Sequence, residues 1–158
     1  MKSVYLDTNA FFFAFFQRKE FSNNIAKIFS KVQKGELKAV TSALTLDELA
    51  YAILMRLVEK KFKRHPIKVL HKDKSAVKEF VPHIQKVFDT IFSMNIEIVS
   101  TNKAHASSIP LLMDDYFLLP RDAIHYQTAL DNGCEYILTT DPDFDNLPKI
   151  KRLNPEKL

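Results

Sequence analysis

Short strand-like apolar segments alternate along this chain with longer segments of helical periodicity, and this alternation constrains the fold most. Strands separated by helices need crossover connections, so the sheet should be mainly parallel, with helices on both faces. The expected strands cover 2–6, 37–43, 96–100 and 136–140, with a short one near 150–153. The expected fold class is therefore α/β, in a single domain spanning 1–158.

The expected helices follow from apolar residues at helical spacing and from helix-end signals. They cover 9–16, 21–34, 45–61, 75–94, 102–115 and 120–132. Gly35 and Gly133, the only glycines, stand where two of these helices should end. Asn9 is the expected N-cap of the first helix. Pro82 and Pro110 are expected to interrupt or kink the helices that contain them.

Several classes of protein are excluded by what the sequence lacks. There is no GxxxxGK[ST] phosphate loop and no GxGxxG dinucleotide loop. Cys134 is the single cysteine, so it cannot form an intrachain disulfide or, alone, a cysteine-based metal site. No apolar run approaches the ~20 residues of a membrane span, and the N-terminus does not resemble a signal peptide. The chain is expected to be cytoplasmic.

Positive charge is concentrated in one segment. The net charge is +4, but 60–74 holds seven Lys or Arg and one Asp, which leaves −2 for the rest. Pro66 lies inside this segment, so an unbroken helix is not expected there. The segment is either a solvated connection or a surface that follows a phosphate backbone. Charge alone favours the solvated connection.

Acidic residues recur at strand ends and helix starts. They are Asp7 after the first strand, Glu48 and Asp122 in first helical turns, and Asp141, Asp143 and Asp145 after the fourth strand. Each has a structural alternative: Glu48 follows Thr45 by three, as in a capping box, and Asp122 suits the helix dipole. TTDPDFDN also suits a polar turn. Asp7 has the weakest alternative: it could cap the helix that follows, but Asn9 is available for that role.

The joint placement of these acids points to a metal site. Functional residues of parallel sheets gather at the carboxyl ends of the strands. Several carboxylates in one pocket cannot all ionise without compensation, and Mg²⁺ or Mn²⁺ supplies it through oxygen ligands. Such sites serve phosphoryl transfer or phosphodiester hydrolysis.

Four motifs then occur in one order over nearly the whole chain: VYLDTNAF, TSALTLDELA, LLPRDAIHYQTAL followed by Gly133, and YILTTDPDF. In combination they resemble the PIN-domain ribonucleases, including the toxins of bacterial and archaeal VapBC toxin–antitoxin pairs. The resemblance implies a PIN-like domain with a parallel sheet between helices, an acidic pocket that binds Mg²⁺ or Mn²⁺, and cleavage of RNA. It also implies a homodimer and an antitoxin partner.

Residue roles are carried over from the matching positions. The implied catalytic and metal-binding quartet is Asp7, Glu48, Asp122 and Asp141, with Asp143 as a further ligand and less support for Asp145. The implied supporting residues are Thr8, Asn9 and Thr139. The candidate RNA-binding residues are Lys60, Lys61, Lys63, Arg64, Lys68 and Arg121. The segment from about 60 to 95 is longer than in compact toxins and is interpreted as a basic insertion, which leaves the toxin role open beside RNA processing.

Some interpretations stay open at this level. His125 follows Asp122 by three, on a similar helical face, but a surface or satisfied core histidine is favoured over a site residue. Arg121 either meets phosphate or pairs with an acid. The phenylalanines of 11–16 cover more than one helical face, which indicates core packing alone or partial cover by a second subunit or an inhibitor.

Two rival functions are weighed. An aspartyl-phosphate phosphatase needs Asp-x-Asp after the first strand, whereas Asn9 stands two residues after Asp7. A PIN-like module that binds RNA or protein without cleavage is the stronger rival, although unused acids crowded together would be destabilising.

Overall fold

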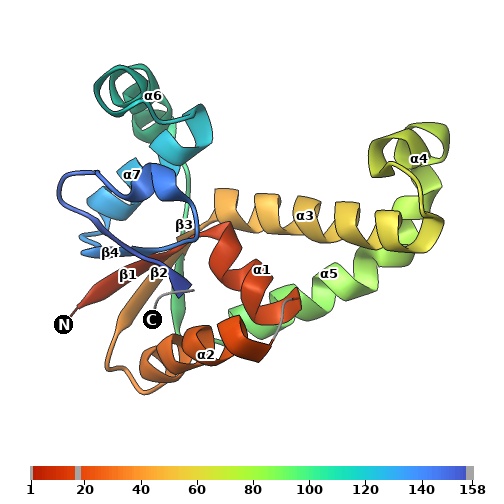
Figure 1. Ribbon diagram of the computed structural model, residues 1–158, viewed down its shortest axis with the longest axis horizontal. Helices are drawn as coiled ribbons and strands as arrows, with labels where there is room; N and C mark the ends of the chain where they lie inside the picture. Colours follow the sequence, from red (N-terminus) through yellow and green to blue (C-terminus); the bar gives the residue numbers. More distant parts are fainter. Residues whose placement is uncertain (1, 17–18, 156–158) are drawn as a thin grey trace.

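The computed structural model describes residues 2–16 and 19–155, which build one parallel sheet covered by helices (Figure 1). The sheet has the strand order β3-β2-β1-β4-β5, and every neighbouring pair is parallel. The strands are β1 (Ser3–Leu6), β2 (Lys38–Ser42), β3 (Ile96–Val99), β4 (Tyr136–Leu138) and β5 (Lys151–Leu153). The expected α/β fold is confirmed, including the short last strand.

The described residues also form seven α-helices and two short 3₁₀ helices. They are α1 (Thr8–Phe16), α2 (Lys19–Gln33), α3 (Ala43–Phe62), α4 (Pro66–Lys72), η1 (Lys74–Ala76), α5 (Val77–Phe92), α6 (Lys103–Tyr116), α7 (Pro120–Asp131) and η2 (Pro142–Phe144). Gly35 and Gly133 follow α2 and α7 with φ of +71° and +64°, so their expected role in ending helices is confirmed. No helix in this part of the chain is long and apolar enough to cross a membrane.

The central strand β1 separates two hydrophobic cores. Val4 and Leu6 belong to the core formed with α1, α2, α3 and α5. Tyr5 belongs to the other core, formed with α6 and α7. Successive side chains of a strand point to opposite faces, so this division places helices on both faces of the sheet. All three side chains are fully buried, as expected for the middle of a parallel sheet.

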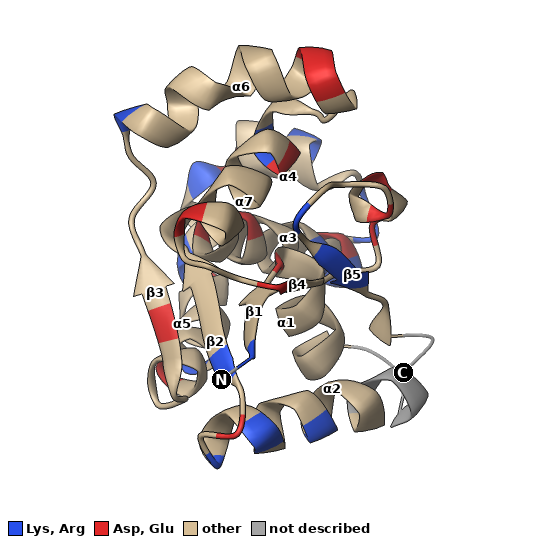
Figure 2. Ribbon diagram, turned by 90° about the vertical axis from the view of Figure 1, so that its left-hand side faces the viewer, with Lys and Arg blue, Asp and Glu red and all other residues tan. Residues whose placement is uncertain are grey.

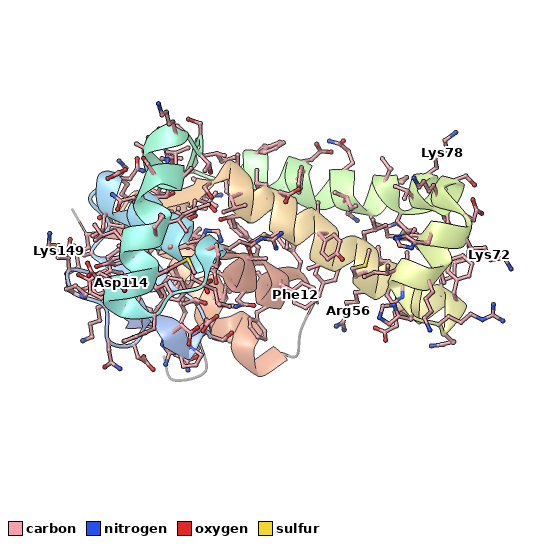
Figure 3. The ribbon with its side chains drawn as sticks, turned by 90° about the horizontal axis from the view of Figure 1, so that it is seen from above. Phe12, Arg56, Lys72, Lys78, Asp114 and Lys149 are labelled. Atoms are coloured by element: carbon pink, nitrogen blue, oxygen red, sulfur yellow. The ribbon has the colours of Figure 1, made fainter. Side chains whose placement is uncertain are left out.

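The phenylalanine run of α1 is only partly absorbed by the core. Phe11 is fully buried and stacks on Phe29, with ring centroids 6.0 Å apart. Phe12 and Phe16 pack against the same core but stay partly exposed, and their rings lie 5.4 Å apart. The Arg56 guanidinium lies 5.5 Å from the Phe12 ring centroid, and both residues are labelled in Figure 3.

The interruption expected at Pro82, and the break that was one of the two outcomes expected at Pro110, are absent. Pro82 lies inside α5 and Pro110 inside α6, and neither ends its helix. Proline in a helix removes one hydrogen bond and costs about 3 kcal/mol. Both prolines are exposed, so water can reach the carbonyl that loses its partner. Packing of each helix by its buried side chains, such as Phe80 in α5, outweighs this local cost.

Helices α3 and α5 form an arm that extends away from the sheet and carries α4 at its far end (Figure 1). The helix α3 ends at Phe62 because Lys63 adopts a left-handed conformation with φ 51°, and Pro66 starts α4. The expected break in the basic segment is therefore confirmed. Figure 3 shows Lys72 of α4 at the opposite end of the molecule from Lys149. The interpretation of 60–95 as an insertion stays a prediction.

Candidate metal centre

The acidic side chains come from neighbouring strand ends. Strand β1 lies between β2 and β4, and all three run in the same direction. Asp7 directly follows β1, Glu48 lies on the helix after β2, and Asp141 lies three residues beyond the end of β4. Figure 2 views the molecule from the side where the N-terminus and the start of β1 lie, so the carboxyl edge lies behind the strands in that view. The sheet order thus brings together acids that are up to 134 residues apart in sequence.

Asp7 is the most buried acid of the group, with 6% of its surface exposed. Its Oδ1 accepts the Thr8 N–H at 2.7 Å, and its Oδ2 accepts the Thr139 hydroxyl at 2.7 Å. The Asn9 amide lies 3.5 Å from both Asp7 Oδ2 and Thr139 Oγ1. Burial raises the pKa of Asp7, against the charge of His125 and the hydrogen bonds from Thr139 and Thr8. The fold therefore holds this carboxylate in place but solvates it poorly.

Asn9 does not cap α1, contrary to expectation. The helix begins at Thr8, one residue earlier, and the Asp7 carbonyl accepts the N–H of Ala10. The strand passes directly into the helix, so the turn that an Asn9 cap requires is absent from this connection. Asn9 instead directs its amide towards Asp7 and Thr139.

Glu48 is not part of a capping box either. The helix α3 begins at Ala43, and its N-cap is Ser42, whose Oγ accepts the Thr45 N–H at 3.2 Å. Glu48 consequently lies in the second turn and is free to face the site. Its Oε2 accepts the Thr8 hydroxyl at 2.7 Å.

The charge of Glu48 is stabilised by its neighbours. Burial would raise its pKa, but the hydrogen bond from His125, the charge of that imidazole, the Thr8 hydroxyl and Arg121 together lower it. Arg121 Nε lies 3.6 Å from Glu48 Oε1. The Arg121 side chain is 68% exposed, so this ion pair contributes little to stability.

His125 lies closer to the acids than its spacing in the sequence indicated. It is 2% exposed, and its two ring nitrogens lie 2.8 Å from the Tyr5 hydroxyl and 3.0 Å from Glu48 Oε2. Burial would lower its pKa, but the hydrogen bond to Glu48 and the charge of Asp7 outweigh burial and raise it. His125 is thus both a satisfied core histidine and a neighbour of the acids. Its spacing of three from Asp122 was the available signal.

A second acidic group consists of Asp122, Asp141 and Asp143, with one carboxylate oxygen from each lying within 4.8 Å of the others. Burial and the negative charge of Asp141 raise the pKa of Asp122 to about 6, while the nearby His125 opposes this rise. Asp141 also caps η2 by accepting the Asp143 N–H at 2.9 Å. The repulsion between these carboxylates is therefore larger than the attraction that the His125 imidazole provides.

Within the described residues, two groups can supply metal ligands. Asp7, Glu48 and His125 form the first, and their ligand atoms also lie within 4.8 Å of one another. The charge of Asp7 also acts on Asp122 of the second group, so the two groups share one electrostatic environment. Oxygen-rich, excess negative charge suits a hard divalent cation such as Mg²⁺ or Mn²⁺. The donor set therefore fits the expected class of metal, without identifying the ion.

Asp145 and all but one of the predicted RNA-binding residues lie away from this centre. Asp145 forms a bidentate ion pair with Arg152, at 2.6 and 2.7 Å, rather than joining the acids. The candidate RNA-binding residues other than Arg121 lie on the arm: Lys60 and Lys61 at the end of α3, Lys63 and Arg64 after it, and Lys68 in α4. Only Arg121 is brought beside the acids. The assigned catalytic and ligand roles stay predictions.

Comparison with known proteins gives a family match and several structural neighbours. The model of the PIN domain matches residues 4–150. Three solved structures cover 96–98% of this chain. VapBC2 from Rickettsia felis, bound to a DNA fragment from its promoter, has 15% identity, 98% coverage of that chain and a TM-score of 0.62. A toxin–antitoxin complex from Klebsiella pneumoniae has 19% identity, 97% coverage of that chain and a TM-score of 0.55. FitAcB from Neisseria gonorrhoeae has 17% identity, 99% coverage of that chain and a TM-score of 0.59.

These structural similarities concern the fold, since every identity is below 20%. Comparison with curated proteins gives no match. The family match covers nearly the whole chain, from within strand β1 to the residue just before strand β5. It includes every acid of the centre. The chain therefore belongs to the PIN-domain family.

Proposed function

We propose that this protein is a Mg²⁺- or Mn²⁺-dependent ribonuclease that hydrolyses RNA phosphodiester bonds at the acidic centre. The observation that carries the proposal is the electrostatics of Asp122. Its pKa is raised to about 6 by burial and by the charge of Asp141, although the charge of the buried His125 imidazole opposes this rise. Clustered carboxylates with too little positive charge favour a bound cation.

Asp7, Asp122 and Asp141 would hold one or two metal ions, with Asp143 able to add a further oxygen ligand. When bound, the metal supplies charge neutralisation at the phosphate and a lowered pKa of bound water. Thr8, Asn9 and Thr139 would orient Asp7 through the contacts given above. Orientation by such surrounding groups sets ligand geometry and affinity.

Glu48 would serve as a further ligand or would orient the attacking water. Thr8 and His125 both contact its Oε2, so Oε1 is the oxygen that is directed towards solvent-exposed Arg121. An ionised Glu48 accepts a stronger hydrogen bond from water than a protonated one, and its lowered pKa supports the ionised state near neutral pH. Arg121 would contribute positive charge to an approaching phosphate.

A protein partner is part of this proposal. Phe12, Phe15 and Phe16 leave apolar surface partly exposed on α1, and Arg56 lies over the Phe12 ring. Two of the structural neighbours are a toxin–antitoxin complex and the FitAcB protein. We therefore propose a homodimer and an antitoxin-like inhibitor as candidates for covering this surface, with the toxin role following if such an inhibitor exists.

RNA cleavage tests the proposed function. Purified wild type, Asp7→Asn and Asp114→Asn are incubated with RNA in Mn²⁺, in Mg²⁺ and in EDTA. Asp114 is an exposed acid of α6 and provides the matched control. We expect metal-dependent cleavage by wild type and the control, with a large loss in Asp7→Asn. RNA binding without cleavage by all three would instead support the non-catalytic module, and equal cleavage by all three would place the activity elsewhere.

A further inference from the structure

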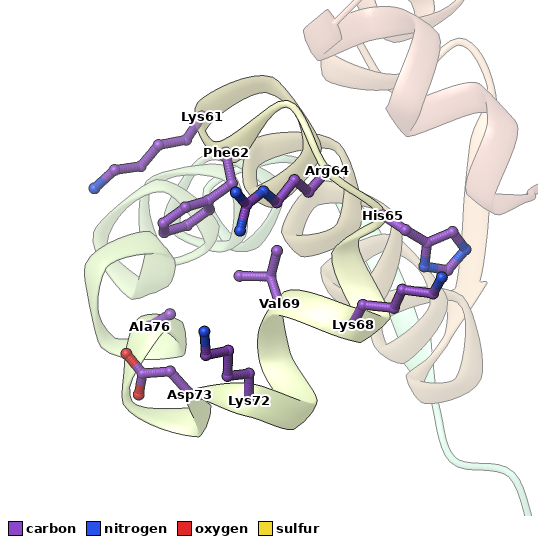
Figure 4. Close-up of a pocket in the computed structure, with 9 residues that line it drawn as sticks. All are labelled: Lys61, Phe62, Arg64, His65, Lys68, Val69, Lys72, Asp73 and Ala76. Carbon is purple, nitrogen blue, oxygen red and sulfur yellow. The ribbon is translucent and has the colours of Figure 1, made fainter.

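The far end of the arm contains a hollow that the acidic centre does not explain. It lies between the end of α3, the helix α4 and the turn η1, and its volume is about 900 Å³ (Figure 4). This volume lies within the range of about 300–1,000 Å³ that is typical of ligand sites.

Positive charge dominates the lining of this hollow. Lys61, Arg64, Lys68 and Lys72 line it together with His65, and Asp73 is the single acid of the lining. Asp73 accepts hydrogen bonds from Ser75, and Lys61 pairs with Glu79. In the part of the chain that the structure describes, Arg64, Lys68 and Lys72 have no ion pair with an acid. These three cations favour an anionic ligand.

The hollow also has an apolar wall. Phe62 is 37% exposed, and Val69 lies in the middle of the lining with Ala76 nearby. Figure 4 shows Arg64 extending towards the Phe62 ring, while the Lys72 ammonium points into the hollow from the α4 side. The Lys61 ammonium lies 5.3 Å from the Phe62 ring centroid, so cations and an aromatic ring lie together in the lining of the same small volume.

We propose that this hollow binds one nucleotide of single-stranded RNA, with the phosphate at Arg64 and Lys72 and the base against Phe62. This proposal rests on RNA being the substrate. A nucleotide combines an anion with a flat apolar ring, and single-strand sites combine basic grooves with aromatic platforms. An acidic peptide would use the cations but would leave the aromatic wall without a flat partner.

The position of the hollow sets the length of RNA that it can help to bind. Lys61 follows Glu48 by 13 residues on the same helix, which corresponds to about 20 Å along its axis. A stacked strand advances ~3.4 Å per nucleotide, so about six nucleotides would connect the hollow with the acidic centre. RNA of about twelve nucleotides can engage both, whereas a dinucleotide cannot.

Binding of a fluorescent, unstructured RNA of about twelve nucleotides tests the proposal in EDTA, where metal-dependent cleavage is blocked. The double variant Arg64→Ala/Lys72→Ala should bind more weakly. Its log–log salt dependence should be shallower by about 0.7, because the contact to one single-strand phosphate is removed. The control Lys27→Ala/Lys31→Ala removes two exposed lysines of α2 and should leave the slope unchanged.

The aromatic wall is tested separately. Phe62→Ala should weaken binding about tenfold, whereas Phe62→Tyr should retain it, because tyrosine keeps the flat ring. Circular dichroism verifies that each variant is folded. Equal binding by the Arg64→Ala/Lys72→Ala variant and its lysine control would overturn the proposal. Displacement of the RNA by an oligoglutamate at the same charge concentration would assign the hollow to an acidic protein and would also overturn it.

Failure of the proposed nucleotide-binding hollow and failure of the proposed nuclease function would give different results. RNA binding that depends on Arg64 and Lys72, in a chain that never cleaves RNA with Mn²⁺, would overturn the nuclease proposal alone. Cleavage of the longer RNA at the same rate and affinity in wild type and in the double variant would overturn the hollow alone.

Discussion

Replacing Thr139 with valine tests the hydrogen bond that holds the most buried acid of the centre. The Thr139 side chain is fully buried, and its Oγ1 donates to Asp7 Oδ2 at 2.7 Å. The same oxygen accepts the Asp141 N–H at 3.1 Å. Valine has nearly the same shape but no hydroxyl, so the variant removes these two hydrogen bonds, the longer 3.5 Å contact from the Asn9 amide, and little packing.

The structure allows the size of the effect to be estimated. A hydrogen bond to a charged group contributes about 1.5–3 kcal/mol. Asp7 keeps its hydrogen bond from the Thr8 N–H, so we expect the free energy of unfolding to fall by about 2 kcal/mol. For a chain of this size that corresponds to a decrease in Tm of about 4–8 °C. Because Thr139 also orients a proposed ligand, affinity for Mn²⁺ should fall about 10–100-fold.

Thermal unfolding in EDTA and calorimetric titration with Mn²⁺, both near pH 7.5, measure the two effects. Thr140→Val is the matched control, because the neighbouring threonine has no side-chain hydrogen bond within the described part of the chain. Its Tm and its Mn²⁺ affinity should remain close to wild type. Identical behaviour of the two valine variants would refute the argument that Thr139 holds Asp7 in place.

Three further predictions concern charge, capping and assembly. The pKa of Asp122 is raised from 3.8 to about 6, so its stabilising contribution is present below about pH 4 and is lost as pH rises through 6. Mn²⁺ should therefore stabilise the protein against urea more at pH 7 than at pH 5; equal stabilisation contradicts this. Ser42→Ala should lower the free energy of unfolding by about 1–2 kcal/mol, because it removes the N-cap of α3 and a hydrogen-bond partner of Tyr5. Unchanged urea unfolding would contradict the capping role of Ser42. Size-exclusion chromatography with light scattering should show a dimer that Phe12→Ser weakens; a monomeric wild type at high concentration would sink the dimer proposal.

The sequence was informative wherever a local pattern and the fold require the same thing. The apolar run that ends at Asp7 predicted both strand β1 and the place of the Asp7 carboxylate at its carboxyl end. The strand order follows from parallel crossovers only once the helices are placed, yet the acids were correctly expected at one edge. This part of the prediction succeeded because the carboxyl ends of parallel strands share that edge.

Local helix signals were less reliable because the helices begin earlier than their patterns indicate. Thr45 and Glu48 match a capping box, but Ser42 caps α3 and leaves Glu48 in the second turn. Asn9 resembles an N-cap, but α1 begins at Thr8. In both places the strand leads directly into the helix, and tertiary contacts at the strand end decide where the helix starts.

His125 could not be assigned from spacing alone. A position three residues after Asp122 indicates a shared helical face, but it does not reveal that Tyr5 and Glu48 approach from two other elements. The buried Tyr5 hydroxyl needed a partner, which was a second, unused signal. The hollow on the arm was equally invisible, because it depends on how α4 folds back after Lys63.

The central claim is that the acids at the carboxyl edge of the sheet bind a divalent cation. Anomalous diffraction from crystals of the protein grown with Mn²⁺ tests it most directly. We predict an anomalous peak contacted by carboxylate oxygens of Asp7, Asp122 and Asp141. No peak at this edge at millimolar Mn²⁺, or a peak held only by exposed acids elsewhere, would contradict the account.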